Sequence, residues 1–216
     1  MRSLTLSDNA KSPLNILCLG AHSDDIEIGC GGTILRLTEQ YPNCILHWVV
    51  FSATGVRAAE AQRAAALFAG KAALRGPVLK SFQDGFMPFV GADIKTTFEG
   101  LKPISPDLVL THNRNDAHQD HRLIAELTWN TFRDHLILEY EIPKYDGDLG
   151  QPNVFVPLEP DGFQKKVSYL LDAFQSQHSK RWFREETFLS LMRLRGMECN
   201  APSGYAEAFY CRKMML

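Results

Sequence analysis

The chain has 216 residues, of which 45% are hydrophobic and 22% are charged, and its net charge is -2 at pH 7. This length and composition predict a single domain with a sizeable core, and the charge gives no reason to expect a nucleic-acid partner. No stretch approaches the roughly 20 apolar residues of a transmembrane helix.

Strand and helix patterns alternate along the chain. Strands are predicted at residues 16–19, 45–51, 77–82, 107–111, 136–142 and 204–210, and helices at 26–40, 57–69, 94–101, 118–132, 161–177 and 185–195. Asp161 is expected to cap the helix that it opens, and Gly196 to stop the last helix. The alternation predicts an α/β fold of three α/β/α layers, with a mostly parallel sheet covered by helices on both faces.

Residues 147–160 differ from the rest, because they carry three prolines and little periodicity. We expect a long surface connection there that forms part of a substrate rim. The single domain, residues 1–216, is thus expected to have a core at about residues 14–142. A helical, substrate-rim part would follow at about residues 143–216.

The cysteines indicate a reducing compartment. There are five, an odd number, and no pair has C-x-x-C spacing, so a disulfide framework is disfavoured. Residues 1–13 are polar and lack the apolar centre of a signal peptide. We therefore expect a soluble cytoplasmic protein.

The first candidate site follows the first predicted strand. His22 and the adjacent carboxylates Asp24 and Asp25 stand where this strand ends and a helix begins. In an open parallel α/β sheet, ligands bind at the carboxyl ends of the strands. His22 and Asp25 are of types that bind a divalent metal, and Asp24 is a carboxylate beside them that can act as a base.

A second cluster follows the predicted strand at residues 107–111. It contains Asp116, His118, Asp120 and His121, and it opens the next predicted helix. His118 and His121 are three residues apart, so a helix presents both on one face. If the two strands are neighbours, the two clusters converge.

The combined set suits metal-assisted amide hydrolysis. A catalytic zinc takes three protein ligands and leaves one position for water, and His22, Asp25 and His121 would supply the three. Asp24 would take the proton of the activated water as general base. His118, when protonated, would stabilise the oxyanion or protonate the leaving amine.

Each cluster also has a simpler interpretation. The adjacent Asp24 and Asp25 could only cap a helix, and the segment 118–121 could be a solvated helix start. The presence of both clusters at strand ends in one α/β chain argues against two caps. Asp120 or Asp116 would orient one of the imidazoles. His112 has no paired carboxylate in the sequence and is interpreted as structural.

Two motifs resemble those of a known family. Residues 21–33 resemble the signature A-H-P-D-D-x-E-x-G-x-G-G-T of the PIG-L/LmbE-like deacetylases, with Ser23 in place of the proline. Residues 116–122 resemble the second signature, D-x-H-P-D-H-x, with Gln119 in place of its proline. Without these prolines the two loops are less restricted in φ, but no proposed ligand changes.

Shorter elements extend the resemblance over about residues 16–210. Residues 57–64 match an R-x-x-E-x-x-x-A element, and residues 204–209 resemble a C-terminal Y-A-E-x-F. The resemblance implies a Rossmann-like fold and zinc-dependent removal of an N-acetyl group from an amino-sugar conjugate of the N-acetylglucosamine type. It implies the following roles: zinc ligands His22, Asp25 and His121, general base Asp24, oxyanion or general-acid histidine His118 tuned by Asp120, and substrate-binding Arg57.

Other functions stay open at this point. The substrate could be a different acyl or conjugate amide, and another divalent ion could replace Zn²⁺, because N and O ligands do not select zinc by affinity alone. A Rossmann-like nucleotide-binding module without hydrolysis is disfavoured, since the first turn is acidic and lacks G-x-G-x-x-G. The expected partner is a small-molecule N-acetyl amino-sugar conjugate, and homo-oligomers are frequent in the family.

Overall fold

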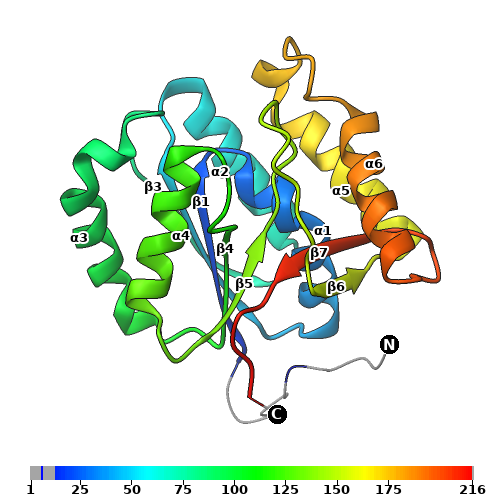
Figure 1. The fold of residues 1–216 in the computed structure, drawn as a ribbon, viewed down its shortest axis with the longest axis horizontal. Coiled ribbons are helices and arrows are strands. Elements are labelled where there is room, and N and C mark those ends of the chain that lie inside the picture. Colours follow the sequence, from blue (N-terminus) through cyan, green and yellow to red (C-terminus); the bar gives the residue numbers. More distant parts are fainter. Residues whose placement is uncertain (1–5, 7–12, 216) are drawn as a thin grey trace.

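The computed structural model describes residue 6 and residues 13–215. A seven-stranded sheet with the order β3-β2-β1-β4-β5-β7-β6 forms its centre (Figure 1). The five strands from β3 to β5 are parallel, and β7 runs antiparallel to both of its neighbours. The strands are β1 Asn15–His22, β2 Ile45–Ser52, β3 Ala73–Leu79, β4 Leu108–His112, β5 Leu136–Tyr140, β6 Val154–Pro157 and β7 Ala206–Tyr210.

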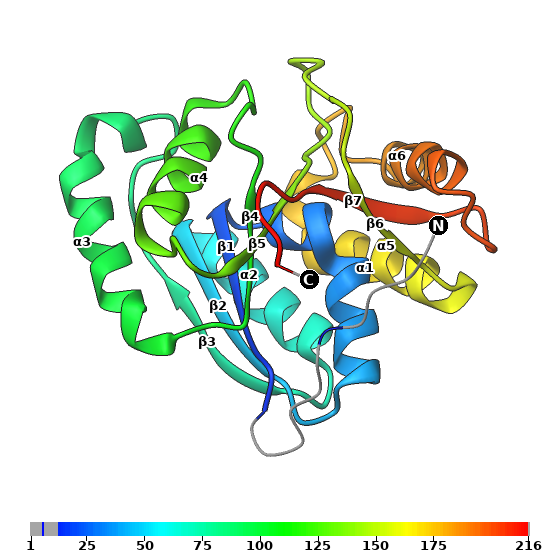
Figure 2. The ribbon, with the colours of Figure 1, turned by 60° about the horizontal axis from the view of Figure 1, so that its bottom comes forward.

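Helices cover both faces of this sheet (Figure 2). The longer helices are α1 Asp25–Gln40, α2 Gly55–Ala69, α3 Gly91–Leu101, α4 Gln119–Thr131, α5 Pro160–Ala173 and α6 Glu185–Glu198. Three short 3₁₀ helices are η1 Met87–Val90, η2 Lys102–Ile104 and η3 Gln175–Gln177. The predicted three-layer α/β/α fold with a mostly parallel sheet is therefore confirmed.

The alternation of side chains along β1 divides the core in two. Ile16 and Cys18 pack with residues of α1, α2, α5 and α6. Leu17 and Leu19 point to the other face and pack with residues of α3 and α4. Because β1 is apolar on both faces, it suits the centre of a sheet that helices cover on both sides.

Several predicted boundaries were wrong. Strand β3 spans Ala73–Leu79, not residues 77–82, and it includes Pro77, which an edge strand tolerates. The predicted connection at 147–160 contains the strand β6. Helix α6 continues past Gly196 to Glu198, and a Cβ at Gly196 would lie 2.1 Å from the Gly204 carbonyl oxygen. That glycine allows close packing and does not end the helix.

Helix α5 begins one residue earlier than predicted. Pro160 is its first residue and Glu159 occupies the cap position, with no side-chain cap hydrogen bond. Asp161 therefore lies in the first turn and is not the capping residue. Its charge still favours that end of the helix dipole.

The topology marks one place for a ligand. The chain leaves β1 through α1 on one face of the sheet and leaves β4 through α4 on the other face. Since β1 and β4 are parallel neighbours, a crevice is expected where their carboxyl ends separate. Both predicted clusters lie there. Within residue 6 and residues 13–215, none of the helices has the length and apolar character needed to span a membrane.

Candidate active site and metal centre

The two predicted clusters converge between β1 and β4. His22 is the last residue of β1, and Asp24 and Asp25 lead into α1. His121 lies in the first turn of α4, which follows β4. The ring nitrogens His22 Nδ1 and His121 Nε2 are 3.1 Å apart, although 99 residues separate them in the chain.

His22, Asp25 and His121 form a compact triangle of ligand atoms. Asp25 Oδ2 lies 3.3 Å from His22 Nδ1 and 3.6 Å from His121 Nε2. Ligands at about 2.0–2.1 Å from a tetrahedral zinc ion lie roughly 3.3 Å from one another. The spacing of these three atoms therefore fits the base of a tetrahedral metal site.

The opposite nitrogens of the two rings contact carboxylates. His121 Nδ1 is 3.0 Å from Asp116 Oδ2, and His22 Nε2 is 3.3 Å from Asp120 Oδ2. These carboxylates accept the ring N–H, which leaves lone pairs on the two inner nitrogens. Two lone pairs that face each other at 3.1 Å repel unless a proton or a cation lies between them. The donor set thus fits a divalent cation.

The ionisation of the two inner groups follows from the same contacts. Burial opposes the charged form of His22, but the carboxylates around it, above all Asp25, raise its pKa well above its ordinary value. Burial alone would raise the pKa of Asp25, but His121, His112 and His22 hold it well below its usual range. Asp25 is therefore an ionised carboxylate, as a metal ligand must be.

The Asp24 carboxylate forms an ion pair with Arg57. Its Oδ1 lies 2.7 Å from Nη2 of Arg57, which lies in the first turn of α2. Its Oδ2 is buried and has no hydrogen-bond partner among the residues that the structure describes. Burial raises the pKa of Asp24, although the Arg57 guanidinium acts in the opposite direction. This carboxylate has one oxygen held and one free to accept a proton.

His118 occupies the N-cap position of α4. Its Nδ1 accepts a hydrogen bond from the backbone N–H of Asp120 at 3.3 Å, so its Nε2 carries the hydrogen in the neutral ring. Its ring lies edge-on to that of His22, with centroids 4.9 Å apart. Burial and the neighbouring rings of His121 and His22 lower the pKa of His118. The structure therefore favours a neutral donor, where the sequence analysis expected a protonated one.

The Asp120 carboxylate contacts the ring of His22. It also accepts hydrogen bonds from the backbone N–H of Gly85 at 2.7 Å and of Met87 at 3.2 Å. The backbone N–H of Asp120 donates to His118 Nδ1 at 3.3 Å, and its carboxylate lies within 4.8 Å of a ring nitrogen of His118. Asp120 therefore joins His22 to the loop after β3.

Two residues near the site were missed. Nε2 of the fully buried His112, which was interpreted as structural, lies 3.1 Å from Asp25 Oδ2 and 3.0 Å from the backbone N of Ala21. The available signal was its position at the end of β4, which matches that of His22 in β1. The largely exposed Asp84 contacts His22 Nε2 at 3.0 Å from the turn after β3. An isolated Asp-Gly turn gave no signal for this contact.

The geometry can be compared with known proteins. The sequence profile of the family described as PIG-L, GlcNAc-PI de-N-acetylase, matches residues 17–132, which is more than half of the chain. The match begins inside β1 and ends just after α4, so it includes both clusters.

Solved structures share the fold over almost the whole chain. N,N'-diacetylchitobiose deacetylase from Pyrococcus horikoshii is 20% identical, with a TM-score of 0.72 over 96% of this chain and 86% of that one. A conserved protein from Thermus thermophilus is also 20% identical, with a TM-score of 0.74 over 94% and 96%. The 4-carboxy-2-hydroxymuconate hydratase from Pseudomonas putida is 18% identical, with a TM-score of 0.67 over 94% and 98%. At such identities, the likeness establishes the fold and not the reaction.

Proposed function

The chain belongs to the PIG-L family of GlcNAc-PI de-N-acetylases, and from this premise we propose that it is a metal-dependent hydrolase that removes the acetyl group from an N-acetylated amino sugar. The observation that carries the proposal is the triangle of ligand atoms from His22, Asp25 and His121. Beside it lies the carboxylate of Asp24, whose Oδ2 has no hydrogen-bond partner among the described residues. Amide hydrolysis needs an activated water, a base and a donor for the oxyanion, and this site offers a candidate for each.

His22, Asp25 and His121 would hold the metal, and their spacing is compatible with zinc, the ion that we propose. A bound zinc ion lowers the pKa of water to about 7 and polarises a carbonyl oxygen. The protein's part is to hold the two rings in one tautomer, which Asp116 does for His121 and Asp120 does for His22.

Asp24 is the proposed general base. Its free Oδ2 would accept the proton of the attacking water as the oxygen forms a bond to the acetyl carbon. The same carboxyl group would return that proton to the sugar nitrogen when the C–N bond breaks, which gives acetate and a free amine. Arg57 keeps the other oxygen of Asp24 in place.

His118 is the proposed donor to the oxyanion. Because its Nδ1 accepts the Asp120 N–H, its Nε2–H is available to the carbonyl oxygen as negative charge develops there. This role does not require a protonated ring. A neutral imidazole donor also leaves proton transfer to Asp24 alone.

An N-acetyl amino sugar is the best supported substrate class. The family description names a de-N-acetylase of an N-acetylglucosamine conjugate, and a structure of the same fold is a deacetylase of an N-acetylated disaccharide. A hydratase also shares the fold, so the family match, which includes both site motifs, carries more weight than the fold.

A substrate panel tests the proposal. The zinc-loaded protein would be incubated with N-acetyl amino sugars that carry different aglycones, and with N-propionyl and N-butyryl analogues, while release of primary amine is measured. We expect amine release from at least one N-acetyl sugar, and its loss in Asp24→Asn at unchanged zinc content. A protein that binds zinc but cleaves none of these amides contradicts the proposal. Faster cleavage of the N-propionyl or N-butyryl analogues would show that the enzyme prefers an acyl group longer than acetyl.

A further inference from the structure

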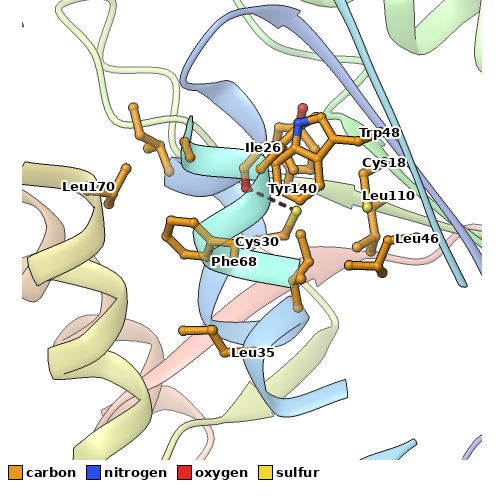
Figure 3. Packing of buried hydrophobic residues seen from close by; sticks show 14 of the residues in the cluster. Cys18, Ile26, Cys30, Leu35, Leu46, Trp48, Phe68, Leu110, Tyr140 and Leu170 are labelled. Atoms are coloured by element: carbon orange, nitrogen blue, oxygen red, sulfur yellow. Dashed lines mark hydrogen bonds between the residues drawn. The ribbon is translucent and has the colours of Figure 1, made fainter. Parts of the chain in front are cut away.

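Helix α1 is kinked shortly after it leaves the proposed site. Cys30 has φ -144° and ψ 17°, outside the helical region, and the helix resumes beyond it. The Cys30 thiol donates to the carbonyl of Ile26 at 3.2 Å, within a closely packed core (Figure 3). Asp25 begins the short segment before the kink, so the direction of that segment determines where its carboxylate lies.

A buried ion pair takes up the backbone groups at this kink. In a regular helix the Gly32 N–H donates to the carbonyl of Ile28. Here the Gly32 N–H donates to Glu207 Oε1 at 2.8 Å, and the Ile28 carbonyl accepts from Lys166 Nζ at 2.6 Å. Lys166 and Glu207 contact each other at 2.6 Å, and Glu207 Oε2 accepts the Thr33 N–H at 2.6 Å.

The pair comes from the C-terminal part of the chain. Lys166 lies in α5 and Glu207 in β7, and both side chains are only 3% exposed. Desolvating two charges is costly, and apolar side chains can often replace such a pair without loss of stability. Stability alone therefore gives a weak reason for the pair, whereas its hydrogen bonds to α1 give a specific one.

The segment before the kink is also held from its other side. A Cβ at Gly29 would lie 2.2 Å from the ring of Tyr140, so this ring packs directly on the helix backbone. The Tyr140 hydroxyl donates to the Leu19 carbonyl of β1 at 2.6 Å. Residues 25–29 are thus fixed between the sheet and the ion pair, and Asp25 has little freedom to move.

We propose that Lys166 and Glu207 are positioning residues, which fix the kink of α1 and thereby hold Asp24 and Asp25 in register with the two histidines. The inference rests on the proposed function, because it assigns Asp25 to the metal and Asp24 to the water. It gives the C-terminal part of the chain a direct structural link to the reacting groups.

Zinc affinity tests this role without any substrate. Lys166→Met and Glu207→Gln would be compared with wild type by competition with a chromophoric chelator, and by the visible spectrum of the Co²⁺-loaded protein. We expect about tenfold weaker zinc binding and an altered Co²⁺ spectrum in both variants. With zinc in excess, we expect kcat to fall while KM changes little.

A second buried pair provides the matched control. Arg195 and Glu141 line the same small cavity as Lys166 and Glu207, and the hydrogen bonds of Arg195 go to Glu141, Glu198 and Gly150. Arg195→Met therefore also leaves a buried glutamate without its cation. We expect it to lower the melting temperature as Lys166→Met does, but to keep wild-type zinc affinity and Co²⁺ spectrum.

The conservative Glu207→Asp keeps the buried negative charge but shortens the side chain by one methylene group. It provides the measurement if Lys166→Met and Glu207→Gln do not fold. We expect its zinc affinity to fall several-fold. Variants that bind zinc as tightly as wild type while they melt earlier would show a purely structural pair and overturn the inference. A wild type that binds zinc but deacetylates no sugar would overturn the proposed function alone, and one that binds no zinc would overturn both.

Discussion

The guanidinium of Arg57 joins Asp24 to Glu60. Its Nη2 lies 2.7 Å from Asp24 Oδ1, and its Nη1 donates to Glu60 Oε2 at 2.8 Å. Glu60 in turn accepts hydrogen bonds from the backbone N–H and the hydroxyl of Ser176, at 2.8 and 2.7 Å. The proposed base is therefore connected through Arg57 and Glu60 to Ser176, which follows α5.

This connection predicts that Arg57 acts on turnover more than on substrate affinity. In Arg57→Ala, Asp24 loses the donor that fixes its direction, and we expect kcat to fall by about 100-fold, the order of loss for a misplaced catalytic group. Arg63→Ala is the control, because Arg63 lies in the same helix but donates to the backbone of Asp172 and Ala173. Steady-state kinetics decide the matter: a higher KM at unchanged kcat would place Arg57 on the substrate instead.

The convergence of His22 and His121 could be predicted because it depends on backbone rules. Strand ends and helix starts were visible in the sequence, and the carboxyl ends of neighbouring parallel strands lie at one edge of a sheet. The partner of the Asp120 carboxylate could not be predicted. Its contacts with His22 and Gly85 depend on the course of the loop after β3 and on a side-chain direction.

The missed strand β6 has a similar explanation. It has four residues, none of them fully buried, and it pairs only with β7 among the described strands. Its pairing is set by contacts distant in sequence, which local periodicity does not contain. His112 was missed as a site residue because a buried histidine in a strand has the same pattern whether or not it contacts a carboxylate.

Asp116 is predicted to control metal affinity through His121. Its Oδ2 accepts from His121 Nδ1 and also lies 3.0 Å from Nζ of Lys144. Asp116→Asn removes the carboxylate that fixes the tautomer of the ring, and we expect zinc affinity to fall by about 10–100-fold. Asp148→Asn is the control, since Asp148 also pairs with Lys144 but not with His121. Equal zinc affinity in the two variants, measured by chelator competition, would contradict the assignment.

Two helical glycines are predicted to respond to alanine in opposite directions. In α1, a Cβ at Gly29 would overlap the Tyr140 ring, and we expect Gly29→Ala to destabilise the protein by about 1–3 kcal/mol. In α3, a Cβ at Gly100 would meet nothing within 4 Å, and we expect Gly100→Ala to stabilise by about 0.5–1 kcal/mol. Urea unfolding at pH 7 measures both changes, and a neutral Gly29→Ala would show that Tyr140 does not fix α1.

Glu60 is predicted to make stability depend on pH in the acid range. Burial would raise the pKa of its carboxyl group, but the hydrogen bonds from Ser176 and the contact with Arg57 outweigh this and lower it. Since the unfolded chain then binds a proton more readily than the folded one, this contribution is present above the ordinary pKa of about 4.3 and is lost as the pH falls through the lower folded value.

The comparison of Glu60→Gln with wild type isolates this effect. We expect the variant to be less stable by about 2 kcal/mol at pH 7, the order for hydrogen bonds to a charged group, and the difference to shrink as the pH falls below about 4. In a Ser176→Ala background the same substitution should cost less at pH 7, because the hydroxyl no longer donates to the carboxylate. The free energy of unfolding in urea at several pH values provides the measurement. A difference that stays constant from pH 7 to the acid limit of folding would show that the ionised carboxylate contributes nothing.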